Sequence, residues 1–494
     1  MTDETRIPVI IGVGQVNDRT EDPAEALDSF ALMREALGAA DAEAGGGWLK
    51  QMQSLAVVDQ LSFPQLTEIP ERLAAFFGAT PKLCAKTRYP SGDSPVLLLK
   101  EAGERTAAGA VEVGVVGGRE ARLTGSEGAR GAAGAAHAVR DAAAKSAKPW
   151  RAKYGLVAPT DVYPLYENAS RAAWGQTLAE AQRESAELWA GLSRVAAQNH
   201  HAWLRTAASA EQILTPSPEN RLIAFPYTKL MVANASVNQG AGFIVASLAQ
   251  ARAMRVPEAQ LVYVGYGAAA REPSDVLARE SYDRSIALET SLHQALALNG
   301  LEPRDLDHVE LYSCFPCIPK LARRTINWPL ERPISVVGGL TFGGGPVGNY
   351  MSHAVAAMTE ALRQSGRHAL LFGNGGFANT NHCIMLSREP LRRGARSFDV
   401  QAEADARRHP SPPLIEGYAG PGAIETYTVF YARDGAAHFG VVIGKTPRGE
   451  RFLARVRGDD REAISFLTDG AREPVGAAGT AMHAEDGLID WRIG

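Results

Sequence analysis

Gly338-Gly-Leu-Thr-Phe-Gly-Gly-Gly-Pro-Val-Gly-Asn-Tyr-Met351 is the stretch of this sequence that decides the fold. It is dense in glycine, and a segment with helical apolar periodicity follows at once over residues 349–364. Glycine has no Cβ, so another backbone or a ligand can approach it closely. The N-terminus of the following helix favours negative charge. We call residues 338–349 the glycine loop. Its sequence predicts either a tight turn packed against a strand or a loop that binds a ligand.

The elements around the glycine loop recur in one order in two parts of the chain. The first part predicts strand, helix, strand, helix and strand at 8–14, 24–44, 55–59, 96–108 and 111–118, and the second at 260–267, 281–298, 308–313, 349–364 and 368–376. The interval between Gly12 and Gly265 equals that between Val57 and Glu310. Parallel strands joined by helices bury both faces of a sheet, so we predict a duplicated α/β/α layered fold. Loops 89–94 and 343–349 should then occupy comparable positions beyond the strand ends.

A long insertion separates the two halves. Residues 119–153 are rich in Ala, Gly and basic side chains, which indicates a solvated surface segment or, alternatively, a loop facing an anionic ligand. Residues 168–208 look helical, and a second small-residue stretch, 232–242, precedes an expected apolar helix over 243–253. We place the domains at 1–118, 119–255, 256–390 and 413–494, with a linker over 391–412.

The periodicity changes in the last domain. Five short strands are expected, with one helix over 461–468 between the third and the fourth, and the strands span 424–432, 439–445, 451–457, 474–482 and 488–493. This order is typical of a five-stranded barrel of the oligonucleotide-binding (OB) type. The strands lack an evident aromatic and basic face, so we expect no nucleic-acid partner.

Composition narrows the class of protein. The 494 residues carry a net charge of −4, which points to neither nucleic acid nor an anionic membrane. We expect no membrane span and, because the N-terminus does not resemble a signal peptide, a cytoplasmic location. The four cysteines do not form a disulfide framework. Cys314 and Cys317 form a C-x-x-C pair, but a zinc site needs a second pair at ligand spacing, so we expect no metal.

Together these features resemble the thiolase superfamily, most closely the sterol-carrier-protein-type thiolases and their thiolase-like relatives. The resemblance covers roughly residues 5–388. It rests on the glycine loop, the Val-Gly-Gly-Arg-Glu stretch 116–120, the Asn-Ala-Ser stretch within 233–241 and Tyr-Ser-Cys-Phe at 312–315. The resemblance implies that Ser236 contacts coenzyme A (CoA). We expect Gly344, Pro346, Asn349 and Tyr312 to contribute to the same CoA-binding cleft.

The departures from the thiolase pattern concern the chemistry. The nucleophilic cysteine of the family precedes Ser-Gly at a helix start, and Tyr89 occupies that position here. The loop histidine that activates this cysteine is replaced by Gly345, and a second histidine by Tyr312. Cys314 remains and aligns with the acid/base cysteine of the family. His353 lies about two helical turns beyond the lost histidine and reads as a packing residue rather than a substitute base.

Three functional hypotheses follow. The first is a lipid-metabolism protein that binds CoA or acyl-CoA without the usual covalent thiolysis or condensation, and with no permanently bound cofactor. Cys314 alone could still move a proton next to a carbonyl, so non-covalent C–C bond chemistry on a CoA thioester stays open under this hypothesis. The second is an active acetyl-CoA acetyltransferase in which Cys314 or Cys84 is the nucleophile. The third is a non-catalytic scaffold whose C-terminal barrel recruits a partner enzyme of lipid catabolism. Thiolases are homodimers or larger, whereas an added domain covering the dimer surface would leave a monomer.

Overall fold

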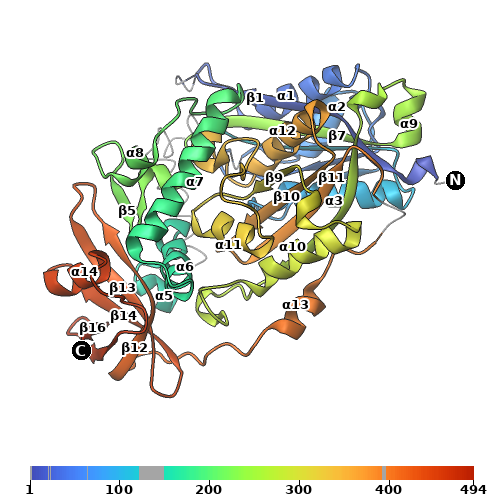
Figure 1. The fold of residues 1–494 in the computed structure, drawn as a ribbon. Coiled ribbons are helices and arrows are strands. Elements are labelled where there is room, and N and C mark those ends of the chain that lie inside the picture. Colours follow the sequence, from blue (N-terminus) through green and yellow to red (C-terminus); the bar gives the residue numbers. More distant parts are fainter. Residues whose placement is uncertain (1–2, 21, 23, 64, 122–148, 392–395) are drawn as a thin grey trace.

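A nine-stranded mixed sheet forms the body of the protein, in a computed structural model that describes residues 3–20, 22, 24–63, 65–121, 149–391 and 396–494 (Figure 1). Two antiparallel strands, β1 (Pro8–Asn17) and β8 (Val262–Arg271), lie side by side where its halves meet. Outward from β1 come β7 (Asn238–Ser247), β4 (Val113–Ala121), β2 (Ser54–Val57) and β3 (Leu83–Lys86). Outward from β8 come β11 (Thr380–Ser387), β10 (His368–Gly375) and β9 (His308–Leu311). The two halves repeat one strand order, and the predicted α/β fold is confirmed.

Helices cover both faces of this sheet. Gly14 lies against α1 (Ser29–Glu43), whereas the next residue, Gln15, bonds to His353 of α12 (Tyr350–Gln364) on the other face. Helix α12 and α3 (Ser94–Ala107) contact each other and strands of both halves. Helix α10 (Ile286–Asn299) covers β8 and β11, and α2 (Ile69–Phe76) packs on β2 and β3. The segments before α3 and α12 are thereby brought together, because Gly348 lies against Pro90.

The predicted helix over 243–253 is wrong for its first half. Residues up to Ser247 belong to β7, and only α9 (Leu248–Ala253) is helical. A Cβ on Gly240 would lie 2.7 Å from the backbone oxygen of Leu32, and one on Gly242 would lie 2.6 Å from the Leu37 side chain. The small residues of β7 therefore admit α1 against the sheet, and its apolar run is that of a strand buried on both faces. Helix α1 itself begins at Ser29, later than expected, where Asp28 accepts a bond from the Ala31 amide.

The insertion between the halves is mostly helical. It contains α5 (Pro149–Lys153), α6 (Pro159–Ala173), α7 (Leu178–Gln198), α8 (Ala210–Leu214) and a short hairpin of β5 (Leu222–Ala224) and β6 (Tyr227–Thr228). Helix α7 begins at a capping box, in which Thr177 and Glu180 bond reciprocally. Most of the basic stretch 119–153, namely 122–148, lies outside the described residues. The second half adds α11 (Cys317–Thr325), and α13 (Gln401–Arg407) leads to the last domain.

The C-terminal domain is a closed five-stranded barrel, as predicted. Its strands close in the order β12, β13, β14, β16, β15 and back to β12, with ranges Gly420–Tyr431, Ala437–Lys445, Arg451–Arg457, Ile489–Ile493 and Ala478–His483. Strands β14 and β16 are parallel, and α14 (Arg461–Thr468) joins β14 to β15. The β5–β6 hairpin extends the barrel sheet, because Ala224 pairs with Phe430 of β12.

Buried polar contacts fix the barrel against the body. Arg451 is fully buried, forms an ion pair with Glu425 and donates to the backbone oxygen of Arg279 at 2.7 Å. Asn168 of α6 donates to the backbone oxygen of Tyr427 at 2.9 Å.

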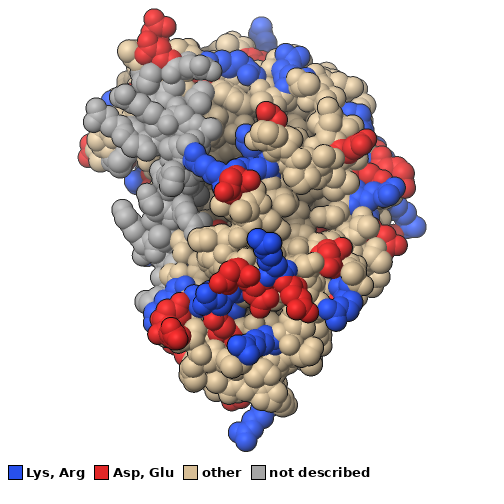
Figure 2. Space-filling model, turned by 90° about the vertical axis from the view of Figure 1, so that its left-hand side faces the viewer, with Lys and Arg blue, Asp and Glu red and all other residues tan. Residues whose placement is uncertain are grey.

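On the face shown in Figure 2, basic and acidic side chains intermix over the barrel end of the molecule. In the part of the chain that the structure describes, no helix is long and apolar enough to cross a membrane.

Candidate functional site

The glycine loop joins the two halves of the fold at the start of α3. A Cβ on Gly348, whose φ is +76°, would lie 2.6 Å from the Pro90 Cβ and 3.0 Å from the Ser91 amide. The amide of Gly345 donates to the backbone oxygen of Asn234 at 2.8 Å. The glycines are thus required by close backbone approach, and segments 89–94, 233–236 and the loop meet in one place. A π-helical turn over Gly339–Gly343 leads into this contact.

The residues expected at a CoA-binding cleft differ in their exposure. Ser236 is half-buried, whereas Gly344, Gly345 and Pro346 are buried. Asn349 is completely buried, and Tyr312 is 7% exposed. The Tyr312 hydroxyl lies directly against Gly92 of the α3 start. Apart from Ser236, the residues expected at the cleft are therefore enclosed by the protein.

Tyr89, which the sequence analysis aligns with the nucleophile of the family, is 56% exposed. It lies in the connection between β3 and α3, one residue before Pro90 against which Gly348 packs. The phenol of Tyr89 is therefore solvated, whereas most other residues of the candidate site are buried. The structure therefore separates Tyr89 from Tyr312 and Cys314 by exposure.

Cys314 is buried beside aromatic rings. It is 7% exposed, and burial raises the pKa of its thiol to about 12, although a hydrogen bond from Tyr163 offsets part of this rise. The Tyr163 ring stacks on Phe315 with centroids 4.4 Å apart. Cys317 is also free and buried, and burial raises its thiol pKa as well. At neutral pH both thiols are protonated, so neither is prepared as a nucleophile.

An aspartate–histidine pair at the same place was not anticipated from the sequence. The Nδ1 atom of His382, on β11, lies 2.5 Å from an oxygen of Asp93, and the Ser91 hydroxyl donates to the other oxygen at 2.5 Å. Burial alone would raise the pKa of Asp93, but His382 and Ser91 hold it below its usual value. The His382 side chain is 12% exposed, so solvent reaches it in part. The pair can hold or move a proton at the N-terminus of α3.

Buried polar atoms without partners lie around the start of α12. His353 bonds through Nδ1 to Gln15 at 2.9 Å, and burial lowers its pKa to about 3, so the imidazole is neutral. The predicted packing role of His353 fits this burial. Among the described residues, no partner exists for Gln15 Nε2, His353 Nε2, Gln239 Oε1 or Asn349 Nδ2. Buried polar atoms normally have partners, and these four belong to neutral groups. Gln239 Oε1 lies against Gly344, whereas Asn349 and His353 lie at the start of α12.

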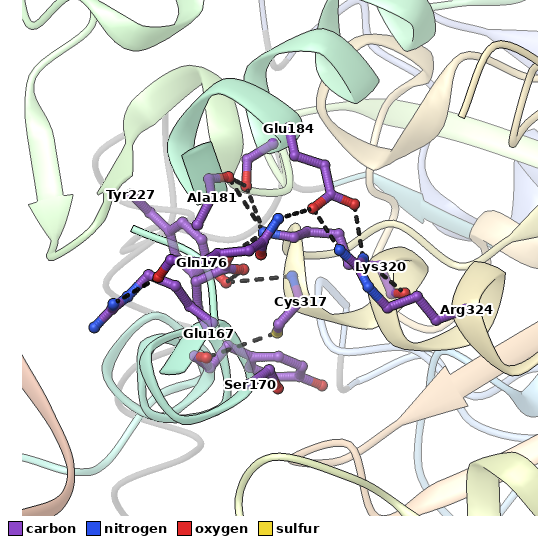
Figure 3. A network of polar contacts seen from close by, with 12 residues as sticks. Glu167, Ser170, Gln176, Ala181, Glu184, Tyr227, Cys317, Lys320 and Arg324 are labelled. Atoms are coloured by element: carbon purple, nitrogen blue, oxygen red, sulfur yellow. Dashed lines mark hydrogen bonds and ion pairs between the residues drawn. The ribbon is translucent and has the colours of Figure 1, made fainter. Parts of the chain in front are cut away.

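A charged network holds the insertion against the second half (Figure 3). Lys320 of α11 forms a fully buried ion pair with Glu167 of α6, and Tyr227 donates to the same carboxylate at 2.8 Å. Glu184 of α7 bonds to Arg324 at 2.7 Å and also pairs with Arg323. The network ends at Cys317, whose amide donates to the Tyr227 hydroxyl at 3.3 Å. The network fixes helix α11, which follows Cys314.

In the described part of the chain, no three His, Cys, Asp or Glu side chains are grouped as a metal site requires.

Comparison with known proteins first defines the class. The structure of human mitochondrial 3-ketoacyl-CoA thiolase in complex with CoA matches with a TM-score of 0.60 at 14% identity, over 78% of this chain and 98% of that one. An acetyl-CoA acetyltransferase of Methanocaldococcus jannaschii is 26% identical over 220 residues, which is 44% of this chain and 50% of that relative. The matched region spans only half of that curated relative. The body of this protein has a thiolase fold.

The family follows from a relative that matches over the full length. The crystal structure of a monomeric SCP2-thiolase-like protein type 1 from Mycobacterium smegmatis is 31% identical, with a TM-score of 0.82 over 99% of this chain and 100% of that one. Residues 399–486 match the thiolase-like protein type 1 additional C-terminal domain. The chain belongs to the SCP2-thiolase-like protein type 1 family.

Proposed function

We propose that this protein binds CoA or an acyl-CoA at the glycine loop and does not form an acyl-enzyme. The observation that supports the proposal is the contact between Gly348 and Pro90, because it joins the glycine loop to the segment that precedes α3. The resemblance to thiolases assigns the histidine to the first segment and the nucleophile to the second. The aligned residues are Gly345 and Tyr89 here. Residues that act as a unit in catalysis lose their effect together, so thiolysis and condensation are expected to be absent.

The pKa of Cys314 argues against acyl transfer through this residue. With a pKa of about 12, roughly one thiol in 10⁵ is ionised at pH 7. A neutral thiol can still donate a proton next to a carbonyl, so Cys314 is proposed as an acid rather than a nucleophile. His382, oriented by Asp93, is the partly exposed group near α3 that can take up a proton.

Ser236 is the proposed first contact for CoA. It is half-buried, and its amide bonds to Asn234 Oδ1 at 3.1 Å, on the residue whose carbonyl holds Gly345. Gly344, Pro346, Asn349 and Tyr312 are proposed to bound the inner end of the cleft, where their burial excludes water. We extend the proposal to a role in lipid metabolism, to the cytoplasm and to a monomer, the last because the Mycobacterium smegmatis relative is described as monomeric.

Mass spectrometry of the intact protein tests the absence of an acyl-enzyme. After incubation with acetyl-CoA, we expect the mass of the wild type to stay unchanged and acetoacetyl-CoA thiolysis to be undetectable. An acetyl adduct that disappears in Cys314→Ala or Cys84→Ser would instead assign the acyltransferase function.

A scaffold function is the second candidate. It is favoured by the way in which Arg451 and Asn168 hold the barrel rigidly against the body, as a fixed docking module would require. In this case a partner enzyme would bind the barrel, and neither CoA nor acetyl-CoA would bind the body. Titration calorimetry with both ligands separates the two functions.

A further inference from the structure

Lys100, in the middle of α3, is a fully buried lysine whose Nζ atom has no hydrogen-bond partner among the described residues. Its stem crosses β8 at Gly267, where an added Cβ would lie 2.6 Å from the Lys100 Cδ atom. Its Nζ atom lies over the ring of Phe398, 3.4 Å from the ring centroid. Phe398 belongs to residues 396–400, which precede α13 and which we call the strap. The strap therefore covers the end of the Lys100 side chain.

An isolated β-bridge holds the strap on β8. The Ala269 amide donates to the Phe398 backbone oxygen at 2.7 Å, and the Val400 amide donates to the Ala269 backbone oxygen at 3.0 Å. The strap leads through α13 to the barrel (Figure 1). Helix α13 has an anchor of its own, because Arg407 bonds to Thr290 of α10 at 2.7 Å. Lifting the strap therefore breaks the bridge to β8 without releasing α13.

The groups whose charges act on the amine of Lys100 lie on α3, on β11 and on the strap, and they are Cys383, Glu104, Asp93 and Asp399. None of them forms an ion pair with this lysine among the described residues. Asp93 bonds to His382 instead, and Glu104 accepts from the Arg396 amide at 3.1 Å. Burial lowers the pKa of Lys100 from 10.5 to about 7, although these charges offset part of the fall.

Protonation of Lys100 favours an open strap. In the closed form the charged amine is buried without a hydrogen bond, and only the face of the Phe398 ring offsets part of this cost. An open strap lets water reach the amine, so its pKa returns toward 10.5. The closed form is therefore most favoured at alkaline pH, becomes less favoured as pH falls from 10.5 to about 7, and changes no further below that.

We propose that the strap is a pH-sensitive element that opens on acidification, when Lys100 takes up a proton. The Phe398 ring moves away from the lysine, the bridge to Ala269 is lost, and the start of the connection to the barrel leaves the body. The proposal does not rest on the CoA-binding function.

Hydrogen exchange of the full chain at pH 6 and pH 8.5, read by mass spectrometry, tests the proposal. Rates are corrected for the intrinsic pH dependence of amide exchange. The peptide that contains Val400 should be about ten- to thirtyfold less protected at pH 6, because the two forms differ in the pKa of Lys100. Peptides of β1, inside the sheet, should stay protected at both pH values, which separates local opening from unfolding of the body.

Three variants assign the effect to the lysine. Lys100→Met keeps an unbranched stem over Gly267 but cannot be protonated, so protection should be equal at both pH values. Lys50→Met, at an exposed lysine, is the matched control and should keep the difference of the wild type. Phe398→Leu changes only the strap and removes the ring that faces the charge, so it should widen the difference.

Equal protection of the wild type at pH 6 and pH 8.5 would overturn the proposal. A pH dependence that persists in Lys100→Met would overturn it as well. If Lys100→Met does not fold, Phe398→Leu decides, and an unchanged or smaller difference in that variant would contradict the role of the ring and the lysine.

Discussion

At the scale of single residues, burial decides what the cysteines of this protein can do. Cys314, Cys317 and Cys383 are buried, and burial raises the pKa of each thiol. Cys84, on the edge strand β3, is only half-buried. Thiol reactivity follows the thiolate fraction and the access of reagents to the sulfur, so the Cys314 thiol should be a poor nucleophile in the free protein.

Alkylation should therefore distinguish the four cysteines. With iodoacetamide at pH 8, we expect only Cys84 to react in the native protein and all four to react after unfolding in guanidinium. Peptide mass spectrometry measures the sites, and Cys84→Ser is the control that should leave the native protein unlabelled. Rapid native labelling of Cys314 would show that its thiol is more exposed or more acidic than its burial implies.

Glu310 makes the stability of the body depend on pH. Burial raises the pKa of this carboxyl from 4.5 to about 7, although Tyr350 and Ser335 bond to it. A carboxyl whose pKa is higher in the folded state stabilises the fold below its unfolded pKa, and this contribution is lost as pH rises through the folded pKa. We expect the free energy of unfolding to fall by about 3 kcal/mol between pH 4.5 and pH 8 through this group.

Urea unfolding at several pH values measures this slope. Glu310→Gln cannot ionise, so this variant should show a flatter dependence of the free energy of unfolding on pH. If the variant kept the slope of the wild type, Glu310 would not be the source of the pH dependence.

Sequence patterns could single out Tyr89, Gly345 and Cys314 as candidates, because each lies in a local motif. The Asp93–His382 pair could not be found in this way, since its two residues are 289 positions apart and meet only through the position of β11, a strand that the sequence did not indicate. The burial of Asn349 and Pro346 could not be predicted either, because the sequence of a glycine-rich loop is the same whether other segments cover it or leave it open.

At the scale of elements, the glycine loop depends on its closest contact. Gly348 has φ +76°, and its Cα faces Pro90 without room for a Cβ. Gly348→Ala should lower the free energy of unfolding by about 3 kcal/mol, from the left-handed backbone and the clash together.

The matched control is Gly78→Ala, at φ +68° with no atom within 4 Å of the added Cβ. It should cost about 1 kcal/mol, from the backbone alone. Denaturant unfolding compares the two, and equal losses would mean that the loop yields to the added methyl group.

Capped helices and turn-bounded barrel strands were predictable at this scale because their signals are local. Helix α14 spans the predicted residues, with Asp460 as its N-cap. Strand β7 was misread because a doubly buried strand has a continuous apolar run, which a short buried helix also has.

At the scale of the whole molecule, the barrel and the body form a joint core of polar contacts. Arg451 lies fully buried at this junction, with Glu425 and carbonyl groups of residues 277 and 279 as partners. Arg451→Met leaves the Glu425 carboxylate without this cation, so we expect a loss of about 3–5 kcal/mol and separate unfolding of barrel and body. Differential scanning calorimetry measures both. Arg457→Met, on an exposed barrel arginine paired with Asp459, is the control and should change little.

The fold class and the barrel were predictable from the order of elements, since both rest on repeated local patterns. The junction was not, because the pairing of Ala224 with Phe430 joins segments that carry no shared motif. A single transition for Arg451→Met, at the temperature of the wild type, would show that this junction contributes little.

Isothermal titration of the full chain with CoA tests the central claim most directly. The account predicts saturable heat with CoA and with acetyl-CoA, no acetylation of the protein afterwards, and at least tenfold weaker binding by Ser236→Trp, which fills the proposed first contact at the half-buried position. The absence of heat when CoA or acetyl-CoA is added to the wild type would contradict it. Thermal unfolding of the wild type and of Ser236→Trp, which should be identical, is the control for folding.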